Sequence, residues 1–218
     1  MSREKVVESI LENKLIAILR GLKCEDAVKT VQALYDGGFR LAEVTFDMSD
    51  ESSWQNTADT VAALCAHFEG LMHIGVGTVI NEQQVALAKA AGAEFVISPD
   101  TCAEVIVRTR KEDMVSIPGA LTPSEILTAH KLGADFVKVF PAVDMGPGYL
   151  KNVLSPLSGI SLLAVGGVNK DNIRSYLAAG AKGAGLGGKL VDKKLIAAGN
   201  FAEITALAKE YVELVRED

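Results

Sequence analysis

The amino-acid sequence predicts a single α/β domain, a (β/α)8 barrel over residues 1–218 with a short N-terminal helix. Eight short apolar segments recur along the chain, and most of the stretches between them have the pattern of amphipathic helices. Eight strand–helix units in 218 residues are typical of a compact barrel, and an open doubly wound sheet is the alternative.

The predicted strands are short, and the early ones are apolar at nearly every position. That pattern is typical of parallel strands buried on both faces, and their shortness favours strands over buried helix segments. In chain order they are LIAILR (15–20), RLAEVTF (40–46), MHIGVG (72–77), EFVIS (94–98), MVSIPG (114–119), DFVKVF (135–140), SLLAVGG (161–167) and GAGLGG (183–188).

Most of the predicted helices begin at a capping residue and end at glycine. Examples are residues 24–38, 81–93, 122–134 and 169–181. A helix, a glycine and then a strand follow one another repeatedly, which indicates one repeated βα unit. A first helix before residue 14 and a last one from Phe201 to Arg216 are expected to flank the barrel.

Composition restricts the class of partner. The net charge of -6 and the absence of clustered Lys and Arg argue against nucleic acid, so the expected partner is a small molecule. No apolar run approaches the roughly 18 residues of a membrane span, and the charged N-terminal stretch lacks the apolar region of a secretory signal. A cytoplasmic protein that does not bind membranes is expected.

Neither the cysteines nor the histidines indicate a metal site. Cys24, Cys65 and Cys102 are far apart and show no zinc spacing or disulfide framework. The histidines do not fall at predicted strand ends; His67 and His130 lie on predicted helices, and His73 begins a strand. We therefore expect no metal and no other cofactor.

Active sites of (β/α)8 barrels lie at the carboxyl ends of the strands. Lys138 stands out there because it lies between Val137 and Val139, where it should face the barrel interior. Burial lowers the pKa of a lysine and yields the neutral amine that attacks a carbonyl carbon to form an imine. Alternatively, Lys138 extends past the strand to solvent or pairs with a carboxylate.

Glu43 interrupts the apolar strand LAEVTF and should project from a neighbouring layer of the barrel interior. A carboxyl group near an imine can give and take the proton that making or breaking a neighbouring carbon bond requires. Alternatively, Glu43 forms a purely structural ion pair with Lys138 or Arg20.

Other strand ends offer groups that bind anions. Arg20 closes the first strand, where a guanidinium suits a carboxylate or phosphate, although a surface salt bridge is the alternative. Thr78 adds a hydroxyl beside glycines. The pairs Gly166–Gly167 and Gly187–Gly188 end the seventh and eighth strands, where barrels often bind phosphate through backbone amides.

Taken together and in order, the motifs LIAILRG, GFRLAEVTF, IGVGTVIN, AGAEFVISP, IPGALTPSE, KVFPA, AVGGVN and GAGLGG resemble the 2-keto-3-deoxy-6-phosphogluconate (KDPG) and 4-hydroxy-2-oxoglutarate (KHG) aldolases of bacteria. The resemblance covers nearly the whole chain. It implies a metal-independent class I aldolase, usually a homotrimer, that cleaves a 2-keto-4-hydroxy acid to pyruvate and an aldehyde such as glyceraldehyde 3-phosphate or glyoxylate.

The resemblance also implies residue roles. Lys138 would form the Schiff base and Glu43 would be the general acid/base. Thr78 and the backbone near Pro99 would surround the pyruvate portion. The far end of the substrate, typically a phosphate, would be held by Gly166, Gly167 and the loop with Gly187 and Gly188.

Three positions depart from the family pattern. Asp47 stands where some members have arginine, so we expect carboxylate recognition to rest on Arg20. The eighth strand ends in Gly187-Gly188-Lys189 where members commonly have Gly-Ser, so Lys189 could supply the charge for the missing hydroxyl. Val165 stands where many members have threonine.

Two other functions remain open at this point. The barrel could isomerise or epimerise a sugar phosphate, with Glu43 as the base and Lys138 as an electrostatic partner. It could also bind a metabolite without catalysis, because one fold hosts many functions.

Overall fold

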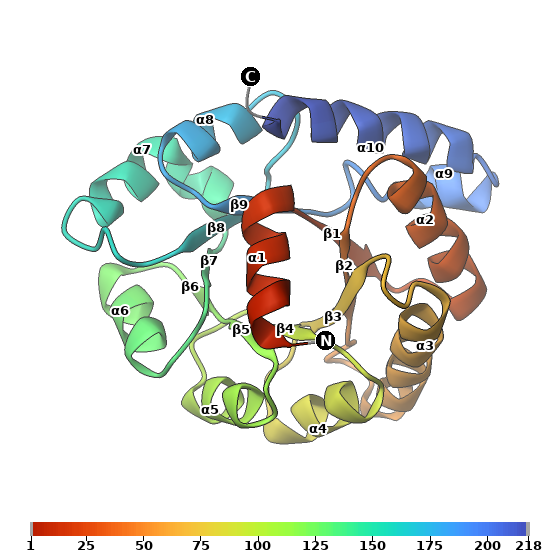
Figure 1. Ribbon diagram of the computed structural model, residues 1–218, viewed down its shortest axis with the longest axis horizontal. Helices are drawn as coiled ribbons and strands as arrows, with labels where there is room; N and C mark the ends of the chain where they lie inside the picture. Colours follow the sequence, from red (N-terminus) through yellow and green to blue (C-terminus); the bar gives the residue numbers. More distant parts are fainter. Residues whose placement is uncertain (1, 217–218) are drawn as a thin grey trace.

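The computed structural model describes residues 2–216 and shows parallel strands around a central axis, with helices on the outside (Figure 1). The strands are β1 (Leu15–Arg20), β2 (Leu41–Thr45), β3 (His73–Gly77), β4 (Phe95–Ile97), β5 (Val115–Ile117), β6 (Gly119–Ala120), β7 (Val137–Val139), β8 (Leu162–Val165) and β9 (Gly183–Leu186). Within the described residues, no helix is both long and apolar enough to cross a membrane.

The helices are α1 (Arg3–Asn13), α2 (Cys24–Asp36), α3 (Trp54–His67), α4 (Glu82–Ala90), α5 (Ala103–Lys111), α6 (Pro123–Lys131), α7 (Ala142–Leu154), α8 (Ile173–Ala178), α9 (Lys193–Ala197) and α10 (Phe201–Val215), and a 3-10 helix, η1 (Glu51–Ser53), precedes α3. Helix α1 precedes the first strand, a helix follows each strand except β5, and both α9 and α10 follow β9.

The sheet closes through Pro118. In strand order it runs β5-β4-β3-β2-β1-β9-β8-β7-β6, so its two ends are segments that only Pro118 separates in the sequence. β5 pairs with β4 and β6 pairs with β7, all in parallel. Proline has no backbone N–H to give to a ladder, but its carbonyl oxygen accepts a hydrogen bond from the Lys138 amide at 2.8 Å. The barrel prediction is confirmed, and the open sheet is wrong.

Three of the predicted strands differ from those of the structure in ways that affect the site. The fifth predicted strand, residues 114–119, is interrupted at Pro118. The seventh and eighth strands end at Val165 and Leu186, before their glycine pairs, because Gly166 and Gly167 adopt positive φ angles of 90° and 78° and the pair after Leu186 lies in a turn.

The apolar side chains form two cores. The larger fills the space between the strands and the outer helices, and it includes Val137, Val139 and Val44. The smaller fills the inside of the barrel and includes Leu41, Phe136 and Leu163. Because alternate residues of a strand point to opposite faces, a single strand can contribute to both cores, as β1, β2, β4 and β8 do.

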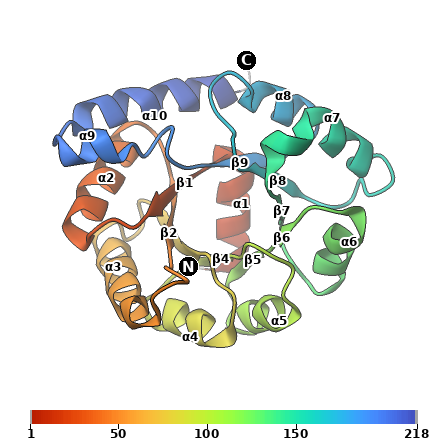
Figure 2. The same ribbon diagram turned by 180° about the vertical axis from the view of Figure 1, so that it is seen from behind.

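Helix α1 covers the end of the barrel where the strands begin (Figure 1). Val6 and Ile10 from this helix are 1% exposed and belong to the inner core. Arg3 donates a hydrogen bond to the Asp135 carboxylate, which also accepts from the Ser116 amide at 2.9 Å. Viewed from the opposite side, the strands lie in front of α1 (Figure 2). The inner core and α1 therefore fill this end.

Candidate active site

Lys138 points into the barrel. Its neighbours Val137 and Val139 belong to the outer core, whereas Phe136, two positions earlier, belongs to the inner core. Strand alternation therefore places the Lys138 side chain inside, and it is 8% exposed. The same rule places Glu43 inside, two positions after Leu41, and it is 2% exposed.

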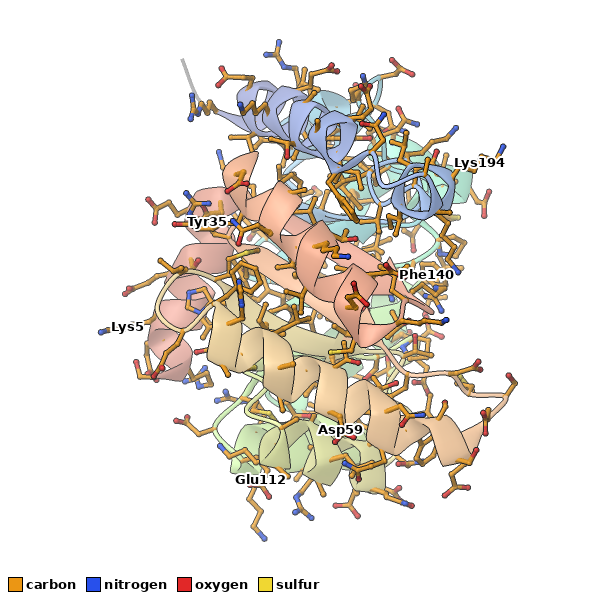
Figure 3. All side chains as sticks on the ribbon, turned by 90° about the vertical axis from the view of Figure 1, so that its right-hand side faces the viewer. Lys5, Tyr35, Asp59, Glu112, Phe140 and Lys194 are labelled. Atoms are coloured by element: carbon orange, nitrogen blue, oxygen red, sulfur yellow. The ribbon has the colours of Figure 1, made fainter. Side chains whose placement is uncertain are left out.

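A cavity of about 550 Å³ opens at the carboxyl ends of the strands, above the inner core. In the side view, Lys5 of α1 lies at one end of the molecule, and Phe140, which lines this cavity, lies at the other (Figure 3). The structure brings every predicted site residue into this one cavity: Arg20, Glu43, Thr78, Pro99, Lys138, Gly166, Gly167, Gly187, Gly188 and Lys189.

Glu43 occupies space that a glycine leaves free. A Cβ atom built on Gly77 would lie 1.4 Å from Glu43 Oε1, so no side chain fits at position 77 while the carboxyl group stays in place. Oε2 of Glu43 is buried and has no hydrogen-bond partner among the described residues. An unpaired buried carboxyl oxygen is costly, and it leaves one acceptor available to a ligand or water.

Burial shifts the pKa values of Glu43 and Lys138 in opposite directions. Loss of hydration raises the pKa of Glu43, and the charges of Lys138 and Arg20 oppose that rise. Loss of hydration also lowers the pKa of Lys138; Glu43 opposes the fall and Arg20 adds to it. Among residues 2–216, no ion pair within 4.0 Å joins Glu43 to Lys138 or Arg20. The purely structural ion pair is therefore not what the structure shows.

Phe140 covers the lysine. Lys138 Nζ lies 4.7 Å from the centre of the Phe140 ring, and this ring is itself 41% exposed at the rim. Gly166 makes room for that ring, because a Cβ there would lie 3.0 Å from Phe140 Cδ2. The aromatic face favours a cation at Nζ, so it opposes the effect of burial while it shields the amine from water.

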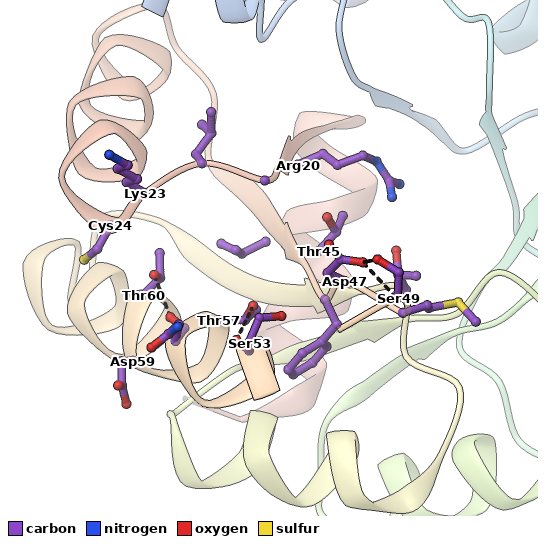
Figure 4. Close-up of a pocket in the computed structure, with 17 residues that line it drawn as sticks. Arg20, Lys23, Cys24, Thr45, Asp47, Ser49, Ser53, Thr57, Asp59 and Thr60 are labelled. Carbon is purple, nitrogen blue, oxygen red and sulfur yellow. Dashed lines mark hydrogen bonds between the residues drawn. The ribbon is translucent and has the colours of Figure 1, made fainter. Parts of the chain in front are cut away.

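Arg20 lies on the wall between the cavity and a second, larger groove of about 820 Å³ (Figure 4). Asp47 lines this neighbouring groove, where its carboxylate accepts hydrogen bonds from the amide and hydroxyl of Ser49 at 2.9 and 2.6 Å. These bonds lower the pKa of Asp47, and the charge of Arg20 contributes further. Lys23 also lines this groove but is exposed, whereas the buried Lys138 and Glu43 line the smaller cavity.

Thr78 is strained. Its φ of 59° lies in the left-handed region, which a β-branched residue rarely adopts. The residue follows β3 and lines both the cavity and the groove. Because such strain persists only where the surroundings enforce it, and it concentrates at functional sites, the conformation supports a binding role for Thr78.

The far side of the cavity is formed by the two glycine pairs. Gly167 packs on Val143, where an added Cβ would lie 2.4 Å from the valine Cβ, so this turn is held tightly. Gly187 and Gly188 have open space around them. Lys189 follows on the exposed side of the same loop.

Sequence reasoning did not select Phe140 or Lys193, although both line the cavity. Because alternate residues of a strand face the same side, Phe140, two positions after Lys138, could have been predicted to face inward as well. Lys193 begins α9 beyond an irregular loop, so no periodicity places it. His67 and His130 lie on helices, as expected, and His73 pairs with Glu94 at 2.8 Å at the other end of the barrel. Residues 2–216 contain no group of three His, Cys, Asp or Glu side chains placed to bind a metal.

Comparison with known proteins gives one consistent result. The family model for KDPG and KHG aldolase matches residues 6–207. The chain is 35% identical over 205 residues to the 2-dehydro-3-deoxy-6-phosphogalactonate aldolase of Escherichia coli, covering 93% of this chain and 95% of that one. It is 32% identical to the E. coli KHG/KDPG aldolase, with 94% of each chain covered.

Among solved structures, the chain is similar to the KDPG aldolase of Legionella pneumophila. The TM-score is 0.83 at 28% identity, with 93% of this chain and 96% of that one covered. The Legionella structure holds pyruvate captured at low pH as a covalent carbinolamine intermediate.

Proposed function

Because the chain belongs to the KDPG and KHG aldolase family, we propose that it cleaves a 2-keto-4-hydroxy acid to pyruvate and an aldehyde through an imine on Lys138. Candidate substrates are 2-keto-3-deoxy-6-phosphogluconate, its galactonate epimer and 4-hydroxy-2-oxoglutarate. The observation that supports this most is the pair of buried ionisable groups, Lys138 and Glu43, in the cavity above the apolar inner core.

The lysine performs the covalent step. Its neutral amine attacks C2 of the keto acid to give a carbinolamine, which takes up a proton on its hydroxyl group and loses water to form a protonated imine. When the C3–C4 bond breaks, its electron pair moves into the imine and gives an enamine. The C4 carbon leaves as the aldehyde. C3 of the enamine then takes a proton, and water hydrolyses the imine to release pyruvate and the free lysine.

Glu43 moves the protons. Burial raises its pKa and so favours its protonated form, and its Oε2, which has no partner among the described residues, can accept a hydrogen bond from a ligand or a water molecule. In this proposal the ionised form removes the C4 hydroxyl proton, directly or through a water, during cleavage. The protonated form then returns a proton to C3.

The remaining cavity residues orient the substrate. Arg20 binds the pyruvate carboxylate, since Asp47 stands where some family members have arginine, and Thr78 and the backbone near Pro99 surround the pyruvate portion. Gly166, Gly167, Gly187 and Gly188 receive the far end through backbone N–H groups, with Lys189 adding a positive charge. Such positioning is the larger part of what the barrel contributes to the rate.

Borohydride reduction in the presence of pyruvate tests the covalent step. The expected result is a pyruvate-derived mass on the peptide that carries Lys138, with activity lost as the adduct forms. A Lys138→Met variant should give no adduct, whereas Lys182→Met, which changes an exposed lysine outside the cavity, should react like the parent. A folded protein without an adduct at Lys138 contradicts the proposal and favours an isomerase or a binding protein.

We also propose that the chain forms a homotrimer, which is supported by its family membership. Light scattering coupled to gel filtration should give three times the chain mass of 23.1 kDa. A monomer or dimer at micromolar concentration would contradict it.

We propose a cytoplasmic location because the cysteines are not paired in disulfides. Within the described chain, Cys24, Cys65 and Cys102 are all free thiols, which suits a reducing compartment. Recovery of the aldolase activity in the membrane-free lysate, and not in the culture medium, checks this.

A further inference from the structure

The lining of the catalytic cavity is strongly biased toward positive charge. Four cationic side chains line it, Arg20, Lys138, Lys189 and Lys193, against one acid, Glu43. This is opposite to the whole chain, whose net charge is -6. Within residues 2–216, neither Lys189 nor Lys193 is in an ion pair or a side-chain hydrogen bond, so both charges are available to a ligand.

Lys193 reaches across the opening from one strand end to the next. It begins α9, after the loop that follows β9, yet its Nζ lies 3.4 Å from the position of a Cβ on Gly21. Gly21 follows Arg20 directly and has a φ of 63°, in a turn that leaves room for the ammonium group. Lys193 and Arg20 therefore lie on the same side of the opening. Lys189 lies on the loop after β9, between Gly188 and Lys193 in the sequence.

Charge matching separates the candidate substrates. In the proposed reaction Lys138 is committed to the imine, which leaves Arg20, Lys189 and Lys193 as three lining cations for the substrate's anionic groups. A phosphorylated keto acid brings a carboxylate and a phosphate of about -1.5 to -2, close to three negative charges in all. A dicarboxylate brings two, and an unphosphorylated sugar acid brings one.

We propose that Lys193 is a specificity-determining residue that recognises a phosphate at the far end of the substrate, so that this aldolase acts on phosphorylated 2-keto-3-deoxy sugar acids. The inference rests on the proposed function. It assigns the selectivity to a side chain on α9 in addition to the backbone amides of the glycine turns. In this assignment Arg20 binds the substrate carboxylate, and Lys193 binds the phosphate.

Steady-state kinetics of Lys193→Gln tests the assignment with three substrates. For 2-keto-3-deoxy-6-phosphogluconate, kcat/KM should fall about 10- to 100-fold, as expected for loss of a charge-assisted hydrogen bond. For unphosphorylated 2-keto-3-deoxygluconate, kcat/KM should change by less than about twofold, because this substrate has no anionic group at its far end for Lys193 to contact. With 4-hydroxy-2-oxoglutarate the loss should be intermediate. Inorganic phosphate should also inhibit the parent protein more strongly than this variant.

Two variants serve as matched controls. Lys194→Gln removes a charge from the next residue, which is exposed at the same end of the molecule but does not line the cavity (Figure 3), and it should behave as the parent protein does. Lys193→Arg keeps the charge and should retain most of the preference for phosphate. Equal losses on phosphorylated and unphosphorylated substrates, or equal effects of Lys193→Gln and Lys194→Gln, would overturn the assignment.

Failure of this inference is distinguishable from failure of the proposed function. Pyruvate-dependent borohydride trapping at Lys138 needs no phosphate, so it should be unchanged in Lys193→Gln. A parent protein that forms the pyruvate adduct but shows no preference for phosphorylated substrates would overturn the role of Lys193 alone. A parent protein without the adduct would overturn the aldolase mechanism.

Discussion

At the scale of single residues, the site depends on two ionisable groups that burial drives toward their neutral forms. The pKa of Lys138 lies below its usual value of 10.5, and that of Glu43 lies above its usual 4.5, in both cases mainly because water is excluded. Burial thereby favours the amine form of Lys138 and the protonated form of Glu43 over a wider range of pH than in water. The same change in environment thus prepares a nucleophile and a proton donor.

The rate of imine formation should therefore follow the neutral form of Lys138. We expect the rate of pyruvate-dependent inactivation by borohydride to rise with pH and to level off at an apparent pKa below 10.5. The ionised carboxylate of Glu43 stabilises the ammonium form, so Glu43→Gln should move this apparent pKa further down while it lowers the cleavage rate about 10²- to 10⁴-fold. The trapped fraction after fixed reaction times, measured from acidic pH up to the usual lysine pKa of 10.5, tests this.

Removal of Arg20 should shift the pKa of Lys138 in the opposite direction. Because the guanidinium of Arg20 lowers the pKa of Lys138, Arg20→Gln should shift the inactivation profile upward. Shifts of the same sign in Glu43→Gln and Arg20→Gln would contradict the electrostatic account of the pair.

At the scale of secondary-structure elements, α1 is a plug for one end of the barrel. Ile10→Ala should lower the free energy of unfolding by about 2–4 kcal/mol, because Ile10 is 1% exposed in the inner core. The adjacent Leu11 is 40% exposed, and Leu11→Ala should cost less than about 0.5 kcal/mol. Urea unfolding measures both, and kcat of the folded variants should remain that of the parent, since this helix lies at the end opposite the cavity.

An equal cost for Ile10→Ala and Leu11→Ala would show that α1 does not close the inner core. Lost activity in a folded Ile10→Ala protein would show that the two ends of the barrel are coupled.

The elements and the inward residues were largely predictable from the sequence, for a physical reason. Strands buried on both faces must be apolar throughout, so a charged residue inside such a segment, as at Glu43 or Lys138, is visible against its neighbours. Strand alternation then places it inside. The interruption at Pro118 was not predicted, because the apolar pattern continues across it and only the pairing to two different strands reveals the break.

Lys193 and Phe140 show where such reasoning stops. Lys193 reaches the cavity through a loop whose path depends on tertiary packing, and no local pattern encodes that path. Phe140 lies beyond the last paired residue of β7, so its place at the rim depends on how Gly166 yields room for its ring.

At the scale of the whole molecule, the functional end is expected to reduce stability. For Glu43, whose folded pKa is raised, stability is lost as pH rises from 4.5, because the unfolded chain releases its proton first. For Lys138, whose folded pKa is lowered, stability is lost as pH falls from 10.5, because the unfolded chain binds its proton first. Both losses are present at pH 7.

Replacement of both groups by apolar side chains of similar length should therefore stabilise the protein. The double variant Glu43→Met with Lys138→Met should unfold at higher urea concentration at pH 7, with a gain of about 1–3 kcal/mol, and should be inactive. Each single variant leaves the other group buried alone and should gain less than half of this. A double variant less stable than the parent would contradict the expectation.

The plug at the base of the barrel also bears on the order of events in time. Because α1 and the inner core fill one end, every reactant must enter and leave where the strands finish. In the proposed reaction pyruvate is tethered to Lys138 at the bottom of the cavity, and the aldehyde lies above it toward the opening. The aldehyde must depart first, and in the synthetic direction pyruvate must arrive first. Ordered binding and release is thus a consequence of a cavity that opens at one end only, and it requires no conformational change.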